Sequence, residues 1–210
     1  MQLIVATANA GKFQEIVTIL SDLRISFLSL ASLHGYNPPV EAGRSYAENA
    51  AAKAKAVAAF SGDWALADDS GLEVDALGGQ PGIYSNRYLG PTATDRERNQ
   101  RILELLDGIP LSQRGARFQC AVAVAGPGGE LTLSHGSCDG IISEVPSGHS
   151  GFGYDSIFTV PGFDATMASL PTDVKNRISH RARALENVKP LLRRLALVAV
   201  CNYSGGQTKG

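Results

Sequence analysis

The chain has 210 residues, a length that one or two domains of ordinary size would fill. Hydrophobic residues make up 44% and charged residues 19%, which is enough apolar side chain for a core and excludes an intrinsically disordered protein. The formal net charge of -1 argues against bulk electrostatic attraction to nucleic acid or to a membrane surface. A bound anion must therefore be held by a local cluster of cations.

Targeting signals and metal or redox cysteine pairs are missing. The longest apolar run, residues 195–201, is far shorter than the roughly 20 residues that cross a bilayer, and no basic leader precedes polar Thr7. We therefore expect a cytoplasmic protein. Cys120, Cys138 and Cys201 are too far apart for a Cys-x-x-Cys pair, and we interpret them as reduced, structural thiols.

The first elements alternate between strand and helix. Residues 3–6 predict a strand, and residues 7–12 predict a polar loop. Apolar residues then recur at helical spacing over residues 13–23, which predicts an amphipathic helix. Residues 25–30 predict a second strand.

The next helix carries a signal at each end. Ser45-x-x-Glu48 is a capping-box pattern for its start, and Gly62 lies just past its end. Residues 64–67 predict a third strand, which ends in the turn Asp-Asp-Ser-Gly at 68–71. The chain from there to Gly90 looks like a loop.

The second half predicts two helices and a hairpin. Thr94-x-x-Glu97 caps a helix that Gly108 stops, and strands over 118–124 and 130–135 form a hairpin around Gly-Pro-Gly-Gly. A further strand over 157–160 follows a glycine-rich stretch. One last helix begins near Asp173 and is kinked or restarted at Pro190.

The alternation of elements favours one α/β unit with a mixed sheet and two lobes around a central cleft. We expect a single domain over residues 1–203 and a flexible tail over residues 204–210.

The loop at 7–12 lies between a strand and a helix. A helix N-terminus presents free N–H groups and a positive dipole end, so a phosphate can bind here through Thr7, Ala8, Asn9, Ala10, Gly11 and Lys12. The Walker A pattern is absent. A simple capped turn with an exposed lysine is the alternative.

Two adjacent acids, Asp68 and Asp69, follow the third predicted strand, with Ser70 beside them. Carboxylates in this position often bind a hard cation such as Mg²⁺ through oxygen. The alternative is a turn whose aspartates bond their own backbone. Two acids directly after a buried strand favour metal binding or catalysis.

Aromatic rings and cations gather near the C-terminus. The loop 151–155 contains Phe152 and Tyr154, whose flat rings suit a nucleobase, although either ring could belong to the core. A group of basic residues follows, and spacings of three and four place part of it on neighbouring positions of one helix: Lys175, Arg177, His180, Arg181 and Arg183. A solvated helix face is the alternative. Lys53 is a further candidate phosphate contact.

Six segments together resemble the inosine triphosphate pyrophosphatase family. They are Thr-Ala-Asn-Ala-Gly-Lys at 7–12, Tyr-Ala-Glu-Asn-Ala at 46–50 with Lys53, the block 67–82, Tyr-Ser-x-Arg-Tyr at 84–88, Gly-Phe-Gly-Tyr-Asp at 151–155 and Ser-His-Arg at 179–181. The similarity covers nearly the whole chain in order, and its longest block is highly specific.

The resemblance implies a mixed α/β fold and usually a homodimer. It implies Mg²⁺-dependent hydrolysis of ITP, dITP and XTP to the monophosphate and pyrophosphate, which removes non-standard purines from the nucleotide pool. Asp69 would bind Mg²⁺ and act as the base, and residues 7–12 would hold the triphosphate. The nucleotide site would be completed by Ser70, Phe152, Gly153, Tyr154, Asp155, Lys175, His180 and Arg181.

The chain departs from the family pattern in a few places. The second metal-binding acid falls on Val40 here, which leaves the neighbouring Glu41 as the candidate ligand. Ser156 and Ala182 stand where proline and glycine are usual. Positive charges that could neutralise a triphosphate, together with Mg²⁺, come from Lys12, Lys53, Lys175 and Arg181.

Other functions stay open from the sequence alone. A pyrophosphatase of similar fold could act on modified pyrimidine or other aberrant nucleotides, and product analysis across a panel of triphosphates separates the two. A nucleotide sensor would bind the triphosphate and release it intact. An RNA-binding module is disfavoured, because the chain lacks net positive charge and the aromatic and basic signature of the common RNA modules.

Overall fold

The structure, a computed structural model, describes residues 1–39 and 42–204, with side chains up to residue 198. These residues form a seven-stranded mixed sheet in the order β2-β1-β3-β4-β5-β6-β7. Its strands are β1 (Gln2–Val5), β2 (Ser26–Ser29), β3 (Ala65–Val74), β4 (Gly115–Ala125), β5 (Leu131–Ile142), β6 (Phe158–Val160) and β7 (Ala165–Thr166). β1 pairs parallel with β2 and β3, whereas the pairings from β3 to β7 are antiparallel. The predicted mixed sheet is confirmed.

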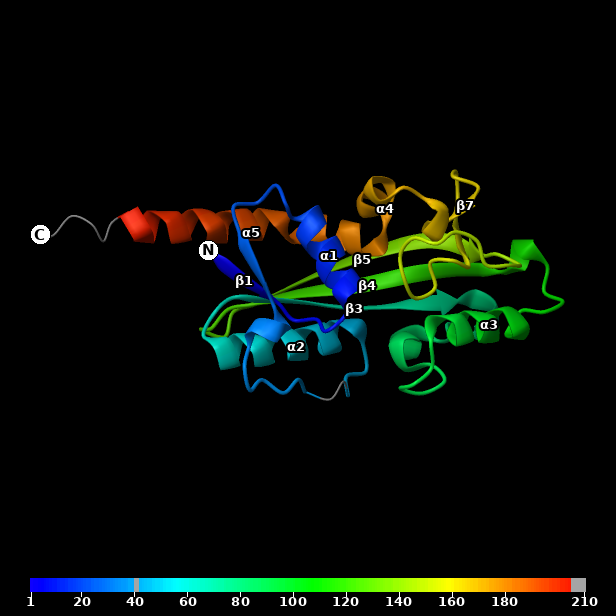
Figure 1. Ribbon diagram of the computed structural model, residues 1–210, viewed down its shortest axis with the longest axis horizontal. Helices are drawn as coiled ribbons and strands as arrows, with labels where there is room; N and C mark the ends of the chain where they lie inside the picture. The colour runs from blue at the N-terminus through cyan, green and yellow to red at the C-terminus, as the bar shows by residue number, and fades with distance from the viewer. Residues whose placement is uncertain (40–41, 205–210) are drawn as a thin grey trace, which may run out of the picture.

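Helices cover both faces of the sheet (Figure 1). On one face lie α1 (Ala10–Ile19) and α5 (His180–Ser204), and on the other lies α2 (Tyr46–Ser61). Farther along the same strands, α3 (Asp95–Leu105) and α4 (Thr172–Ile178) lie on opposite faces.

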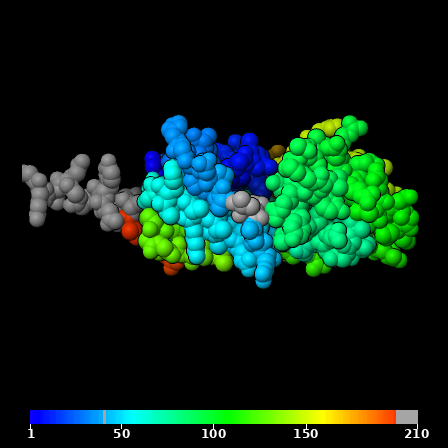
Figure 2. All heavy atoms as spheres, turned by 90° about the horizontal axis from the view of Figure 1, so that it is seen from below, coloured from blue at the N-terminus to red at the C-terminus, as the bar shows by residue number. Residues whose placement is uncertain are grey.

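Three buried clusters explain this layering. Apolar residues of α1 and α5 pack on β1 and β4, while the alanine-rich face of α2 packs on the opposite side of β1, β3 and β4. A third cluster joins α3 and α4 to the far ends of β3, β4 and β5. We call the part with α1 and α2 the first lobe and the part with α3 the second lobe. Figure 2 shows a groove between the two masses.

The predicted helix ends are largely confirmed. Ser45 caps α2 by accepting the amide of Glu48, and Gly62 ends the helix in the left-handed region, with φ of 73°. Only half of the expected capping box is present, because the Glu48 carboxylate accepts the amide of Arg44 instead of Ser45. Both halves of the box form in α3, between Thr94 and Glu97.

The prediction of a turn at 68–71 is wrong. β3 continues through these residues to Val74, because its backbone pairs with β4 along its whole length. Gly71 is suited to this strand interior, since an added Cβ would lie 2.3 Å from the carbonyl oxygen of Gly82. β5 likewise extends beyond the predicted 130–135. Three long strands, β3, β4 and β5, each antiparallel to its neighbour, therefore run from one lobe into the other.

The single C-terminal helix is also a wrong prediction. Ser179 ends α4, and its hydroxyl accepts the amide of Ala182 at the start of α5. Arg177 is therefore on α4, exposed and paired with Asp173 at 3.1 Å. α5 continues through Pro190 without restarting.

The two cysteines whose side chains the structure describes lie in β4 and β5. Cys120 and Cys138 are buried free thiols, and burial raises the pKa of Cys120 to about 12. In the part of the chain that the structure describes, no helix is long and apolar enough to cross a membrane. The side chain of Cys201 and residues 205–210 of the predicted tail lie outside the described residues, whereas Ser204, the first residue of that predicted tail, is the last residue of α5.

Candidate active site

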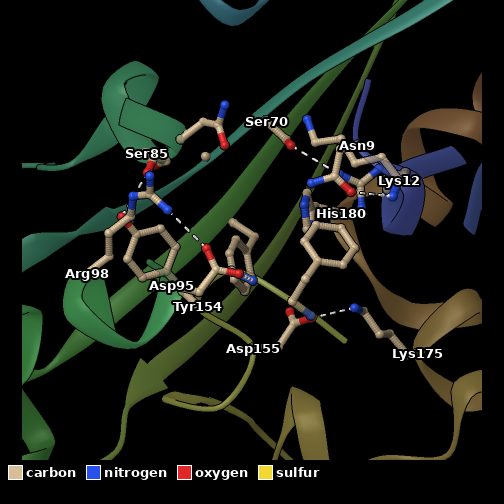
Figure 3. A pocket seen from close by; sticks show the side chains of 16 residues that line it. Asn9, Lys12, Ser70, Ser85, Asp95, Arg98, Tyr154, Asp155, Lys175 and His180 are labelled. Atoms are coloured by element: carbon tan, nitrogen blue, oxygen red, sulfur yellow. Dashed lines mark hydrogen bonds and ion pairs between the residues drawn. The ribbon is translucent and has the colours of Figure 1, made fainter. Parts of the chain in front are cut away.

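The predicted site segments meet in a cleft made of two adjoining hollows. The first, with an open volume of about 610 Å³, is lined mainly by Asn9, Lys12, Ser70, Arg98, Phe118, Phe152, Gly153, Tyr154, Asp155, Lys175, His180 and Arg181. The second, of about 960 Å³, is lined by Thr7, Ala8, Lys53 and Asp69 among others, and it shares Asn9, Lys12, Ser70 and Asn86 with the first. Figure 3 shows Asn9 and Lys12 on one side of the first hollow and Arg98 and Tyr154 on the other.

The phosphate-loop candidate is both a capped turn and an open helix end. Asn9 is the N-cap of α1, and its side chain accepts the amide of Lys12 at 3.0 Å. Ala10 already belongs to the helix, so the predicted loop is shorter than 7–12. The first N–H groups of α1 have no acceptor within the helix, and such groups favour an anion.

Gly11 has a packing role in this arrangement. An added Cβ would lie 2.7 Å from Cδ1 of Phe152. The absence of a side chain therefore lets the aromatic loop approach the start of α1. Ala10 and Gly11 are not among the residues that line the two hollows.

Asp68 and Asp69 point to opposite faces of the sheet, because successive side chains in a strand alternate. Asp68 faces α1 and α5, where it meets Lys12 and Arg181, each at 3.0 Å. Asp69 faces α2. The strand therefore gives two adjacent acids different surroundings, which a turn would not.

One turn of α2 holds Asp69. Its Oδ2 accepts a hydrogen bond from Asn49 Nδ2 at 3.0 Å, and its Oδ1 pairs with Lys53 Nζ at 3.2 Å. Asn49 and Lys53 are four residues apart, so they lie on the same face of the helix. Lys53, predicted as a phosphate contact, is therefore paired with a carboxylate in this structure. The contact of Asn49 with Asp69 was not predicted, although Asn49 lies inside the segment 46–50 that carries the family resemblance.

Asp68 is the centre of a buried ion network. Burial by itself raises the pKa of Asp68, but the charges of Lys12, Arg181 and Lys53 lower it by more than burial raises it. The pKa of Asp68 therefore lies well below its usual range. The carboxylate is therefore ionised at neutral pH. Its Oδ1 is buried and has no hydrogen-bond partner among the described residues.

Sequence reasoning missed Glu15. It is buried on α1 beside Ile16 and Ile19, and its carboxylate pairs with Arg181 and with Lys175, the latter at 2.7 Å. An acid on the apolar face of an amphipathic helix was the available signal, because such a group needs a buried cation as partner.

The cations of the cleft are matched by acids. The four predicted cations are Lys12, Lys53, Lys175 and Arg181, and their carboxylate partners are Glu15, Asp68, Asp69 and Asp155. Arg98, a further cation of the first hollow, pairs with Asp95. The cleft therefore has little spare positive charge for a triphosphate. Of the expected neutralising set, which was these four cations together with Mg²⁺, the side chains alone therefore contribute little net charge.

The two aromatic residues of the glycine-rich loop differ in role. Tyr154 is buried in the core of the second lobe, and its hydroxyl donates to the carbonyl of Ser85 at 2.9 Å. Phe152 is only half-buried, and its ring centroid lies 4.9 Å from Lys175 Nζ. Phe152 is therefore the ring available for a flat ligand.

Asp155 acts within the loop itself. It is buried, and its Oδ2 accepts the amide of Phe152 at 2.9 Å and pairs with Lys175. Burial by itself lowers the pKa of Lys175, but the carboxylates of Asp155 and Glu15 raise it above its usual value. Lys175 is therefore charged in the folded chain.

His180 is a neutral, buried imidazole at the wall of the first hollow. Burial, followed by the charges of Arg181 and Lys175, lowers the pKa of His180 well below its ordinary value. Its ring stacks on Phe118, with centroids 4.7 Å apart, and its Nδ1 has no hydrogen-bond partner among the described residues. A neutral imidazole can donate from one ring nitrogen and accept at the other.

The carboxylates of the cleft suit a metal ion that is bound jointly by the protein and by substrate phosphates. Within the described residues, no group of three or more His, Cys, Asp or Glu side chains is arranged to hold a metal ion by itself. Asp69 lies at the wall of the second hollow, and Mg²⁺ is commonly held by one or two carboxylates together with substrate phosphates. Glu41, the other predicted ligand, lies outside the described residues.

Comparison with known proteins gives the family. A sequence model of the Ham1 family matches residues 3–191. This chain belongs to the Ham1 family. The match spans the strand, helix and loop segments that form the cleft, and it confirms the resemblance inferred from the motifs.

Named relatives and solved structures agree with this assignment. A dITP/XTP pyrophosphatase from Desulforamulus reducens is 44% identical over 195 residues, covering 93% of this chain and 97% of the relative. One from Shouchella clausii is 46% identical over 191 residues, covering 90% and 94%. The structure of a HAM1 protein from Coxiella burnetii superposes with a TM-score of 0.83 at 39% identity, covering 92% of this chain and 99% of the other.

Proposed function

We propose that this Ham1 chain hydrolyses the non-standard purine nucleoside triphosphates dITP, XTP and ITP to the nucleoside monophosphate and pyrophosphate. One observation carries the proposal: a hollow with Lys12, Lys53 and Asp69 in its wall adjoins an aromatic hollow with buried hydrogen-bond donors. The hollow with Asp69, which is the second hollow, suits a triphosphate, and the aromatic first hollow suits a purine. The relatives named dITP/XTP pyrophosphatases support this substrate class.

The triphosphate lies along the second hollow in this proposal. The start of α1 supplies backbone N–H donors, and Lys12 and Lys53 supply charge from opposite faces of β3. Both lysines are paired with aspartates in the free chain, so phosphate oxygens must share or replace these carboxylates. The positive charge that the balanced cleft lacks has to come from elsewhere.

We propose that Mg²⁺ supplies this charge and that Asp69 holds it together with the phosphates. Bound there, the ion would stabilise charge on the leaving pyrophosphate. The match between cleft cations and acids gives a physical reason why the chain itself is an incomplete anion site. In this proposal no side chain forms a covalent bond to the substrate.

Asp69 is the proposed general base. Asn49 and Lys53 fix both of its carboxylate oxygens from one face of α2. In this position Asp69 can orient a water molecule and accept its proton as the water oxygen attacks the α-phosphorus and the bond to pyrophosphate breaks. Lys53 places a positive charge 3.2 Å from Asp69 Oδ1.

The base is read in the first hollow. Phe152 would stack on it, while donors from Lys175, His180 and Arg181 meet the oxygen at the 6 position of hypoxanthine or xanthine. Adenine carries an amino group there, which leaves a buried donor unpaired and costs about 1–3 kcal/mol per group. This difference in binding free energy can separate ITP from ATP.

We further propose that the working form of the protein is a cytoplasmic homodimer.

Turnover with a substrate panel tests the proposal. Wild-type protein is assayed for pyrophosphate release from ITP, XTP, dITP, ATP and GTP with Mg²⁺, and then with EDTA. We expect fast release from the first three and loss of release in EDTA. Binding of ITP without any pyrophosphate would instead identify a nucleotide sensor.

A further inference from the structure

One turn of α3 grips the loop that carries Phe152. Asp95 Oδ2 accepts the amide of Gly153 at 2.7 Å, and Asn99 Nδ2 donates to the carbonyl of Gly153 at 3.0 Å and to Ser156 Oγ at 3.0 Å. Asp95 and Asn99 are four residues apart and share one face of the helix. Both backbone polar groups of Gly153 are therefore bound by a helix that lies 58 and 54 residues earlier in the chain.

Gly153 makes no side-chain contact of its own, whereas the next residue, Tyr154, is buried in the core. Gly153 has φ of 62°, and a Cβ built on it meets no atom within 4 Å. Phe152 and Gly153 line the first hollow on one side and, on the other side, a separate hollow of about 1010 Å³. Phe152 and Gly153 form a thin wall between two open spaces, so the backbone there is held by the hydrogen bonds of Gly153, by the buried Tyr154 that follows and by the contact of Phe152 with the start of α1.

The side chain of Asp95 on α3 is itself held in place by Arg98. Arg98 pairs with Asp95 Oδ1 at 3.1 Å, and its Nε donates to the carbonyl of Tyr88 at 3.1 Å. This pairing leaves Asp95 Oδ2 for Gly153, as Figure 3 shows for Asp95 between Arg98 and the loop. The capping box at Thr94 fixes the start of the same helix turn.

The other end of the loop is held independently. Asp155 binds the amide of Phe152 and pairs with Lys175 on α4. Phe152 therefore lies between two attachments, one to α4 and one to α3 of the second lobe. Loosening the α3 attachment should move the ring without disturbing Asp69, which lies on β3 and is held by α2.

We propose that Asp95 and Asn99 are positioning residues for base recognition, which fix the Phe152 ring through Gly153. The inference rests on the proposed function, because it takes the ring as the stacking partner of the base. It predicts that the pair controls substrate affinity and leaves the bond-breaking step almost unchanged. Neither side chain needs to touch the base.

Four variants test this role. Asp95→Ala removes the acceptor, whereas Asp95→Asn keeps an oxygen that can accept the Gly153 amide. Asn99→Asp keeps the shape but has no N–H donor at neutral pH. Gln100→Ala is the matched control, because this exposed amide is the next residue of α3 and its side chain bonds only to Glu104 among the described residues.

The readouts are steady-state kinetics with dITP and the hydrogen exchange rate of the Gly153 amide. We expect Asp95→Ala and Asn99→Asp to raise KM by about 3- to 10-fold, as the loss of one hydrogen bond implies, with kcat within about 2-fold of wild type. Asp95→Asn and Gln100→Ala should keep the wild-type KM. The Gly153 amide should exchange faster in Asp95→Ala only.

Other results would overturn the inference. Unchanged KM in both damaging variants, or a fall in kcat with constant KM, would show that the α3 contacts do not position the base. If Asn99→Asp fails to fold, Asp95→Ala decides, because its side chain is half exposed. Wild-type protein that releases no pyrophosphate would refute the proposed function instead, and the exchange rate would still report whether Asp95 holds Gly153.

Discussion

Replacement of Arg181 tests the charge balance of the cleft. Its side chain is 2% exposed and joins the carboxylates of Asp68 and Glu15. Arg181→Gln removes one cation of the four and leaves one carboxylate in excess. Removing one partner of a buried ion pair costs about 3–5 kcal/mol, and because Asp68 keeps Lys12 and Glu15 keeps Lys175 we expect the lower end, about 3 kcal/mol.

The loss is measurable as a melting temperature. For a domain of this size, about 1 kcal/mol corresponds to about 2–4 °C, so Arg181→Gln should lower Tm by roughly 6–12 °C. The matched control is Arg193→Gln, because the Arg193 side chain is 59% exposed in its pair with Asp22. Exposed pairs contribute less than about 1 kcal/mol, so the control should melt close to wild type.

A second substitution separates charge from shape. The double variant Arg181→Gln with Glu15→Gln has three cations and three carboxylates in the cleft and should melt at a higher temperature than Arg181→Gln alone. Calorimetry of the four proteins in the same buffer measures this. A double variant no more stable than the single one would refute the idea that unpaired charge causes the loss.

Three further predictions follow from the site and the family. Lys12→Ala should raise KM and lower kcat for dITP, whereas a change in Tm alone would leave Lys12 as part of a capped turn. The pKa of His180 lies well below about 6.5 in the folded chain, so the unfolded state binds more protons below that pH. Stability should therefore fall by about 1.4 kcal/mol for each pH unit below about 6, and urea titrations should find this slope reduced in His180→Phe. Light scattering at micromolar concentration should give the mass of a homodimer, and a monomer mass would reject it.

Local patterns in the sequence predict the elements that local interactions determine. The β1, loop, α1 order, the Ser45 cap and the Gly62 end of α2 depend on residues within a few positions of one another, and the structure confirms them. The extension of β3 through Asp68 to Val74 depends on β4, whose residues lie more than forty positions later. No local signal could show that ladder.

Site residues that belong to a recognisable motif were predicted from the sequence, whereas residues whose role depends on tertiary packing were missed. Lys175, His180 and Arg181 meet Phe152 at the first hollow as expected. Glu15 changes the electrostatics of that hollow, but its role depends on which face of α1 is buried and on cations more than 150 residues later. The break at Ser179, which separates Arg177 from the site, depends on one side-chain cap.

The identity of the products tests the central proposal most directly. Phosphorus NMR of a dITP reaction with Mg²⁺ should show dIMP and pyrophosphate in equal amounts with wild-type protein. Asp69→Asn should keep the fold and slow the reaction by about 10²- to 10⁴-fold, as expected for loss of a general base. Formation of dIDP and orthophosphate, or wild-type turnover by Asp69→Asn, would contradict hydrolysis at the α-phosphorus with Asp69 as the base.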